Sequence, residues 1–443
     1  MPVSLELSDI QGTVLHSRPL PYFGSYLLFE IHEAQSARTL LARLAPHVTS
    51  AQDWEDPPEK AWINVVFSHE GLRKLGVRED HLAGFPIEFR QGMAARKALL
   101  GDIGESDPAN WDLPHGGTGF DIGVMVMASS VALRDQKVAI GHEAVGGLSG
   151  VSLAGKLDVG VPPTLREHFG FHDGISRPFI EGQGGEPLPG QGEAAKAGEF
   201  ILGYKNELGV VARAGGPEEL WRNGTFIAIR KIRQHVAAFR SFLRESAGNL
   251  DEQEFLAAKM MGRWRSGCPL ALAPTRDDPT CVANPLKNNA FSYFDDDREG
   301  RKTPLGSHIR RVNPRDGLKD ALTDVRLHRV LRRGAAYGPL LPEEALQDDG
   351  QDRGIVLAMI NANPGRQFEF VQSQWVNDGD FISQGSRTDP IVGRKDLADD
   401  FLFPARPTRR RLTGLKEFTT VRGGEHVFLP GINGLRWLTE MRP

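Results

Sequence analysis

The sequence predicts an α+β fold in which helices cover one face of an antiparallel sheet. Short apolar runs of strand character alternate with segments whose apolar residues recur at helical spacing, and long insertions separate them. The same strand–helix–strand cycle occurs in both halves of the 443 residues, a length that suits about two or three domains. This alternation with long insertions is typical of an α+β sandwich.

The first half of the chain contains one complete set of these elements. It opens with a strand at Tyr22–Ile31. A helix follows, because Ala37, Leu40, Leu41 and Leu44 fall on one face at helical spacing. The other elements expected here are strands at Ile63–Ser68 and Phe120–Met127 and helices at Gly71–Leu75 and Ala132–His142.

The second half repeats the cycle after the glycine-rich segment Gly182–Gly198, which predicts a surface loop near a domain boundary. A strand at Thr225–Arg230 leads into a helix that places Val236, Phe239 and Leu243 on one stripe. We therefore expect two related domains, residues 1–215 and 216–443. The remaining elements expected are strands near Arg326–Arg332, Gly354–Ile360, Phe418–Arg422 and His426–Leu429, and a helix capped by Asn363-Pro364 that carries Phe368, Val371 and Trp375.

Composition excludes several classes of function. A net charge of −4 and a pI near 6.4 argue against nucleic-acid or anionic-membrane partners. The two cysteines form no CxxC motif, so neither a disulfide framework nor a thiolate zinc site is indicated. The N-terminal residues lack a basic and apolar leader, and no apolar run approaches the ~18 residues of a membrane span. We expect a cytoplasmic protein.

The most informative stretch is Gly306–Asp316, GSHIRRVNPRD. His308 is followed by Arg310, Arg311 and Arg315. Imidazole is the commonest nitrogen ligand of haem iron, and arginines suit the propionates at the edge of a porphyrin. A hydrogen-bonded histidine in a basic loop is the simpler alternative, and the residues of this stretch alone leave both open.

The second stretch, Gly170–Gly174 (GFHDG), places Asp173 between glycines that permit close backbone approach to a flat ligand. Such a turn can project one carboxylate into a cavity, although an ordinary aspartate turn has the same sequence. The adjacent His172 is a competing acid–base candidate. A cation at the acidic run Asp295–Asp297 also stays open.

The third stretch is Val330–Pro339, VLRRGAAYGP. If the chain is a strand here, Arg332 and Arg333 point to opposite faces, so one guanidinium is directed inward. A buried guanidinium needs an anionic or strongly polar partner. A peroxide or a carboxylate in a closed pocket would satisfy it.

Together these stretches resemble the dye-decolorizing peroxidase (DyP-type haem peroxidase) family, and the resemblance covers nearly the whole chain. The matching motifs, in order, are DIQGTVL at Asp9–Leu15, GFHDGISRP at Gly170–Pro178, GEFILGYKNE at Gly198–Glu207, RNGTFIAIRKIRQ at Arg222–Gln234, GSHIRRVNPRD, LRRGAAYGP at Leu331–Pro339, RQFEFVQ at Arg366–Gln372 and TDPIVG at Thr388–Gly393. The length and the missing export signal are similar to the longer, non-exported subgroup.

The resemblance implies roles for individual residues. Asp173 matches the distal acid–base, Arg332 the distal arginine, and His308 the iron ligand. Asp389 matches the carboxylate that hydrogen-bonds the ligand histidine. The other residues expected to contact the cofactor are Ile175, Ser176, Arg177, Arg315, Ile355 and Leu357.

The family also implies a fold and a reaction. The expected fold is a pair of ferredoxin-like domains with antiparallel sheets and peripheral helices, in which mainly the C-terminal domain binds haem b. The expected reaction reduces hydrogen peroxide and oxidises aromatic donors, such as dyes and phenols, by one-electron steps. A haem carrier or sensor, or a deferrochelatase-like protein with weak peroxidase activity, is the alternative. The oligomeric state stays open.

Bulky donors raise a separate question. A distal pocket fitted to peroxide and lined by Ile355 and Leu357 should not admit a large dye. We expect electrons to arrive through an oxidisable aromatic side chain, with Tyr337 and Trp375 as candidates. A tryptophan on an apolar stripe is, however, also typical of a hydrophobic core.

Overall fold

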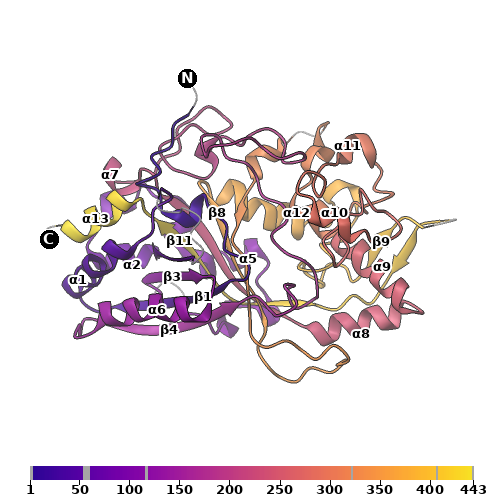
Figure 1. The fold of residues 1–443 in the computed structure, drawn as a ribbon, viewed down its shortest axis with the longest axis horizontal. Helices are drawn as coiled ribbons and strands as arrows, with labels where there is room; N and C mark the ends of the chain where they lie inside the picture. The colour runs from indigo at the N-terminus through magenta and orange to yellow at the C-terminus, as the bar shows by residue number, and fades with distance from the viewer. Residues whose placement is uncertain (1–2, 53–59, 115–117, 321–322, 406–407, 442–443) are drawn as a thin grey trace.

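One antiparallel sheet runs through both halves of the chain (Figure 1). The structure is a computed structural model that describes residues 3–52, 60–114, 118–320, 323–405 and 408–441. Within these residues the sheet has nine strands in the order β4-β1-β3-β2-β11-β5-β8-β6, and β7 also pairs with β8. A second, two-stranded sheet joins β9 (Phe401–Phe403) to β10 (Arg410–Leu412).

The N-terminal half forms the first four strands of this order. Helix α1 (Ala34–Leu44) follows the first strand and α6 (Val131–Val145) follows the third, so the half has the βαββαβ connectivity and the β4-β1-β3-β2 order of a ferredoxin-like fold. All four apolar residues expected on the α1 stripe are buried. The strands are β1 (Phe23–Ile31), β2 (Ala61–Phe67), β3 (Ile122–Ala128) and β4 (Val151–Gly160).

The C-terminal half repeats this arrangement with the order β11-β5-β8-β6. Helices α8 (Val236–Ser246) and α9 (Leu250–Met261) follow its first strand. The two halves meet where Phe428 of β11 pairs with Phe67 of β2. The strands are β5 (Thr225–Gln234), β6 (Leu331–Arg332), β7 (Ala335–Tyr337), β8 (Gly354–Asn361) and β11 (Thr419–Leu429). The expected pair of ferredoxin-like units is confirmed.

The sheet curls, so that β4 at one end of the strand order lies against β7 at the other. Because successive side chains of a strand alternate between faces, each strand contributes to two environments. In β8, Val356, Ala358 and Ile360 belong to a core inside the curl, to which both halves contribute. Residues Ile355 and Leu357 point to the outer face, where a large cavity lies.

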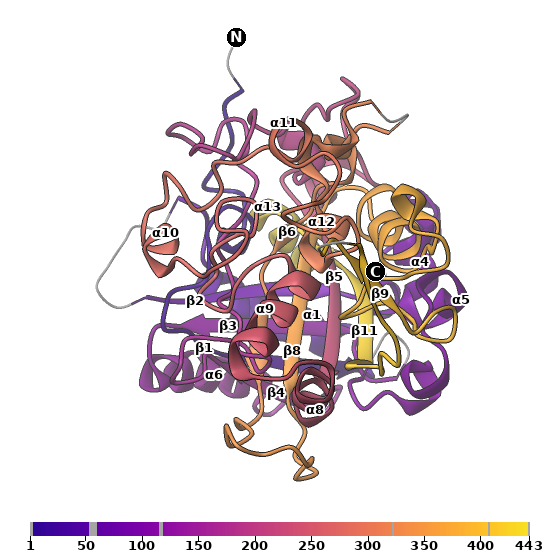
Figure 2. The ribbon, with the colours of Figure 1, turned by 90° about the vertical axis from the view of Figure 1, so that its right-hand side faces the viewer.

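Helices cover the outer face of each half. Helices α1, α2 and α6 of the N-terminal half, joined by α13 from the end of the chain, lie on the left of Figure 1 and bury a separate core against the sheet. Figure 2 looks onto the C-terminal half, with α8, α9 and α12 in front of β5, β8 and β11. No helix in the described ranges is long and apolar enough to cross a membrane. The remaining helices are α2 (His69–Leu75), α3 (Glu79–Leu82), α4 (Ile87–Ala95), α5 (Lys97–Leu100), α7 (Glu218–Trp221), α10 (Pro279–Ala283), α11 (Tyr293–Asp296), α12 (His308–Val312) and α13 (Ile432–Glu440).

Two sequence-based expectations about strands are wrong. The strand expected near Arg326–Arg332 is a 3-10 turn over Val325–His328, because the Asp324 carboxylate accepts a hydrogen bond from the backbone N–H of Arg326, and only β6 remains extended. The two strands expected at the C-terminus are one strand, β11, with a change of register between Val421 and Gly423. A bulge there bends the strand without ending it.

The helix expected after Asn363-Pro364 is present, but it is wound as a π-helix. The Asn363 side chain accepts a hydrogen bond from the Arg366 N–H at 2.9 Å, which confirms the predicted cap. Two π-helical segments follow, η8 (Gly365–Glu369) and η9 (Val371–Val376). They carry Phe368 and Trp375 against the large cavity. π-Helical turns are rare and are often found at functional sites.

Candidate active site

The large cavity lies on the outer face of the C-terminal half and has a volume of about 1080 Å³. Side chains of β8 form an apolar floor that includes Ile355, Leu357 and Met359. The lining also includes residues of α12, of the π-helices and of the loop that contains GFHDG. The cavity therefore brings together segments that are up to about 250 residues apart in the chain, from Glu167 to Thr419.

His308 lines this cavity at the start of α12, and its orientation is held by a carboxylate. The ring Nδ1 lies 2.9 Å from Oδ2 of Asp389, which is fully buried. The other Asp389 oxygen accepts hydrogen bonds from the N–H groups of Ile391 and Val392. Nδ1 is thus the nitrogen that donates, and Nε2 keeps the lone pair that could bind a metal.

The same carboxylate remains ionised in its buried place. Burial alone would raise the pKa of Asp389, but the charge and hydrogen bond of His308, the Val392 N–H and the Arg311 guanidinium lower that pKa to about 2. Asp389 is therefore a permanent acceptor for the His308 N–H. Such partners increase the basicity of a ligating imidazole.

Of the three arginines that follow His308, only Arg315 lines the cavity. The Arg310 guanidinium donates to the Asp297 carboxylate and to the Thr303 carbonyl oxygen, and it is 2% exposed. Arg311 is fully buried and donates to the carbonyl oxygens of Trp375, Arg387 and Asp378. Arg310 and Arg311 therefore hold α12 in place, and Arg315, the one of the three expected to contact the cofactor, is the one that lines the cavity.

Asp173 also lines the cavity, in a turn that its glycines make possible. Gly170 and Gly174 have φ angles of +91° and +82°, which favour residues without a Cβ atom. The Glu167 carboxylate stabilises the turn by accepting from the N–H groups of Phe169 and Phe171. Asp173 Oδ1 accepts from the Gly174 N–H at 2.7 Å.

Two arginines control the charge of Asp173. Burial alone would raise the pKa of this carboxyl, but the nearby guanidinium groups of Arg18 and Arg332 outweigh burial and hold the pKa below its ordinary value of 3.8. Arg18 Nη2 lies 3.0 Å from Asp173 Oδ2. Arg332 lines the cavity and donates to the Ser176 carbonyl oxygen at 3.4 Å. Its neighbour Arg333 points into the curl of the sheet, as the alternation of side chains predicts.

Sequence reasoning missed Arg18. Its partner is 155 residues away, and the local sequence HSRPLP carries no catalytic pattern. The other expected cavity residues, Ile175, Ser176 and Arg177, all line the cavity. His172 lines it as well, and burial lowers the pKa of its imidazole.

The two candidate relay residues lie in different places. Trp375 lines the cavity and is 3% exposed. Tyr337 belongs to the core inside the curl, on the other face of the sheet. Its hydroxyl donates to Asp352 at 3.1 Å, and burial raises its pKa.

The acidic run at Asp295–Asp297 does not assemble a cation site. Asp297 is 5% exposed and accepts hydrogen bonds from Arg310 and from the N–H groups of Lys302 and Thr303. In the part of the chain that the structure describes, no group of three or more His, Cys, Asp or Glu side chains could hold a metal ion.

The residues around the large cavity fit a haem. An apolar floor, one imidazole with its Nδ1 tied to a buried carboxylate, and guanidinium groups on the walls suit a flat macrocycle that carries a metal and acidic edge groups. The guanidinium groups that line the cavity include those of Arg177, Arg315 and Arg329.

Comparisons with known proteins agree with this geometry. Residues 9–145 match the family model of the DyP dimeric alpha+beta barrel domain. The chain is 31% identical to Peroxidase 2 of Mycetinis scorodonius (98% of this chain, 88% of the relative) and 31% identical to a dye-decolorizing peroxidase of Auricularia auricula-judae (98% and 86%). Among solved structures, an ancestral D-type dye-decolorizing peroxidase has a TM-score of 0.86 at 29% identity (98% and 99% covered). A dye-decolorizing peroxidase in complex with 2,6-dimethoxyphenol has a TM-score of 0.84 at 30% identity (99% of both chains).

Proposed function

This chain belongs to the dye-decolorizing peroxidase family, and from that premise we propose residue roles for its reaction. The protein is a haem peroxidase, an oxidoreductase that acts on peroxide and oxidises aromatic donors. The finer proposal is that haem b occupies the cavity of about 1080 Å³, with His308 as the iron ligand and hydrogen peroxide bound on the side of Asp173 and Arg332. The observation that carries it is that one cavity is lined both by His308, whose Nδ1 is held by Asp389, and by Asp173, a carboxylate beside two guanidinium groups.

When bound, the haem supplies the iron that holds peroxide and stores its two oxidising equivalents. The protein's own part begins with Asp173. Its lowered pKa keeps the carboxylate ready to take a proton from one oxygen of hydrogen peroxide and return it to the oxygen that leaves. Arg332 stabilises the negative charge that develops on the departing oxygen.

On the opposite wall, Asp389 keeps the His308 ring in one orientation and makes it a stronger electron donor. The apolar floor at Ile355 and Leu357 excludes water from the reacting atoms. Arg177 and Arg315 are proposed to bind the acidic edge of the cofactor, with Ile175 and Ser176 beside it. The domain boundary near residues 215 and 216 also stays a proposal, supported by the repeated strand order.

A phenolic or dye-like donor is the proposed reductant, since a solved relative was determined with 2,6-dimethoxyphenol bound. The alternative, a haem carrier, sensor or deferrochelatase-like protein, needs neither a distal carboxylate nor a distal arginine. The pairing of Asp173 with Arg332 therefore favours turnover.

The test compares His308→Ala with His172→Ala, a matched removal of an imidazole that lines the same cavity. We expect His308→Ala to lose most of its haem, measured as the ratio of Soret to protein absorbance, and to lose peroxidase activity. His172→Ala should keep both. Full haem occupancy and unchanged turnover in His308→Ala would refute the assignment. Release of free iron from wild type, without oxidation of a phenol, would favour the deferrochelatase alternative.

A further inference from the structure

Arg18 lies between the large cavity and a second, much smaller one. It follows η1 (Gly12–Val14) in an irregular segment, and its side chain is 15% exposed. The guanidinium lies 3.0 Å from Asp173 Oδ2 and 4.4 Å above the centre of the Tyr22 ring. A Cβ atom added at Gly174 would lie 3.5 Å from Arg18 Nη1, an ordinary van der Waals distance, so the turn and the guanidinium are in close contact, and it is the φ of +82° that favours glycine here.

The segment that carries Arg18 also contacts the residues beside both distal groups. Ser17 Oγ accepts a hydrogen bond from Arg177 Nη1 at 2.7 Å. The carbonyl oxygens of Thr13 and Val14 accept from the Arg333 guanidinium at 2.8 and 2.9 Å. Residues 13–18 thus brace the turn that holds Asp173 and the arginine next to Arg332.

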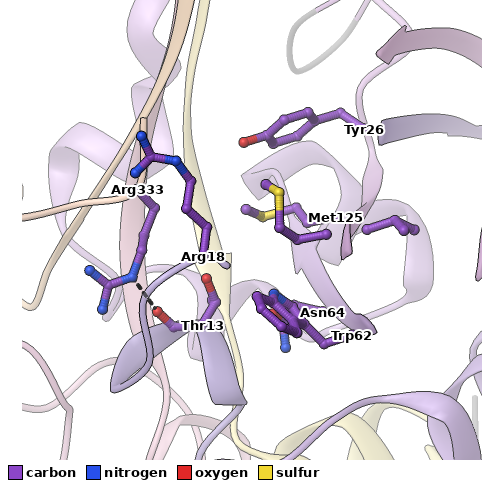
Figure 3. Close-up of a pocket in the computed structure, with 9 residues that line it drawn as sticks. Thr13, Arg18, Tyr26, Trp62, Asn64, Met125 and Arg333 are labelled. Carbon is purple, nitrogen blue, oxygen red and sulfur yellow. Dashed lines mark hydrogen bonds between the residues drawn. The ribbon is translucent and has the colours of Figure 1, made fainter. Parts of the chain in front are cut away.

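The small cavity lies behind Arg18, inside the curl of the sheet. Its volume is about 20 Å³, enough for one water molecule. Figure 3 shows Arg18 and Arg333 on one side of it and Tyr26, Met125 and Trp62 on the other. Among the residues that line this cavity, two buried donors, Arg18 Nε and the Tyr26 hydroxyl, have no protein partner. A water molecule in this cavity can accept from both, which would anchor the back of the Arg18 side chain.

Four charged or titratable side chains face the Asp173 carboxylate. Arg18 and Arg332 favour its ionised form, and the neighbouring groups are Tyr22 and His172. The charge of Arg18 contributes more to the lowered pKa than that of Arg332. Arg18 is also the side chain that hydrogen-bonds the carboxylate.

We propose that Arg18 is a positioning residue for the peroxidase reaction, which holds one oxygen of Asp173 and keeps the carboxylate ionised. This inference rests on the proposed role of Asp173 as the distal acid–base. Arg18 donates a hydrogen bond to Oδ2 of Asp173 and the Gly174 N–H donates one to Oδ1, so the carboxylate is held in one orientation. Arg332 is then available to act on the peroxide itself.

The test measures cyanide association with the ferric enzyme as a function of pH, since hydrogen cyanide must give its proton to a distal base when it binds. It uses Arg18→Leu and Arg18→Gln, with Arg18→Lys as the conservative variant. Arg166→Leu is the control, because it removes an exposed charge from the sequence that leads into the same turn. The pH dependence of kcat/KM for peroxide is recorded in parallel.

The acid limb is the part of a pH profile in which the rate falls as the solution becomes more acidic. In Arg18→Leu and Arg18→Gln we expect this limb to move to higher pH by roughly one to three units, both for cyanide association and for kcat/KM with peroxide. The reason is that a partner charge lowers a carboxyl pKa by that amount. At a fixed pH below the limb, the rate of the variant should be lower than that of wild type by about tenfold for each pH unit by which the limb moves. Arg18→Lys should stay near the wild-type profile, and Arg166→Leu should match it. A loss of rate by the same factor at every pH, with the limb unmoved, would mean that Arg18 is only structural.

A double substitution separates this inference from the proposed function. If Arg18 acts through Asp173, then adding Arg18→Leu to Asp173→Asn causes no further change. Wild-type rates in Asp173→Asn alone would overturn the role of Asp173. An impaired Asp173→Asn together with an unmoved acid limb in Arg18→Leu and Arg18→Gln would overturn only the role of Arg18. Thermal denaturation of each variant verifies that it is folded.

Discussion

At the scale of single residues, the distal chemistry depends on which group acts as the base. Asp173 and His172 are neighbours in the chain and both line the cavity, but the ionised form of Asp173 is the basic one, whereas the ionised form of His172 is the acidic one. The folded-state pKa of Asp173 lies below 3.8, so its basic form is present above that pH and is lost as the pH falls through it. Burial lowers the pKa of His172 from 6.5, and this imidazole becomes cationic in more acidic solution.

The prediction for pH follows from this difference. With Asp173 as the base, the rate constant for reaction with peroxide should remain within about twofold between pH ~7 and ~5 and should fall only below about pH 4. Asp173→Asn should lower it by about 10² to 10⁴, the usual contribution of a general acid–base. Stopped-flow measurement of the haem absorbance checks both. A limb below pH 6.5 that persists in Asp173→Asn and disappears in His172→Ala would identify His172 instead.

At the scale of elements, strand alternation and the π-helix decide which aromatic side chains can exchange electrons with the cofactor. Tyr337 in β7 pairs with Gly354 of β8 and faces the inner core, whereas Ile355 faces the cavity. Trp375, on η9, lines the cavity. Its ring lies 5.2 Å from His328, measured between ring centroids.

We therefore predict that Trp375→Phe lowers the oxidation of a bulky anthraquinone dye by about tenfold or more, while a small phenol is affected less. Phenylalanine keeps most of the packing and removes the easily oxidised indole. Tyr337→Phe is the matched control on the other face of the sheet and should have the smaller effect. Steady-state kcat with each donor measures the difference. If both variants oxidise the dye and the phenol as fast as wild type, neither residue is the relay.

At the scale of the whole molecule, buried charges join the two halves across the shared sheet. Arg96, between α4 and α5, donates two hydrogen bonds of 2.5 Å to Glu369 on η8. His426 Nε2 lies 3.0 Å from the same carboxylate. Burial alone would raise the pKa of Glu369, but these two partners lower it, so the carboxylate is ionised in a place where it is 2% exposed.

Arg96→Leu is expected to lower the free energy of unfolding by about 3–5 kcal/mol, because it leaves a buried carboxylate without its main partner. Urea denaturation followed by circular dichroism measures this loss. Arg78→Leu breaks an exposed ion pair with Asp80 and should leave the denaturation midpoint unchanged. An equal midpoint for wild type and Arg96→Leu would show that the two halves do not depend on this contact.

The sequence by itself determined the elements and the order of the motifs. Apolar residues at helical spacing predicted α1 and α8, and the side chain of Asn363 caps the π-helix as its position before a proline predicts. The motif around His308 and its match to Asp389 also predicted a contact that the structure contains, at 2.9 Å. These signals are readable because they depend on residues a few positions apart or on motifs kept as units.

Beyond the contact of His308 with Asp389, only the tertiary structure decided which side chains meet. The sheet order brings Arg18 to Asp173 across 155 residues, and nothing in the local pattern of either segment specifies the other. Arg310 and Arg311 belong to the same motif as His308, but they do not line the cavity, because the carbonyl oxygens and the carboxylate around α12 bind them. A guanidinium group accepts any well-placed oxygen as its partner, so the identity of that partner depends on how distant segments pack.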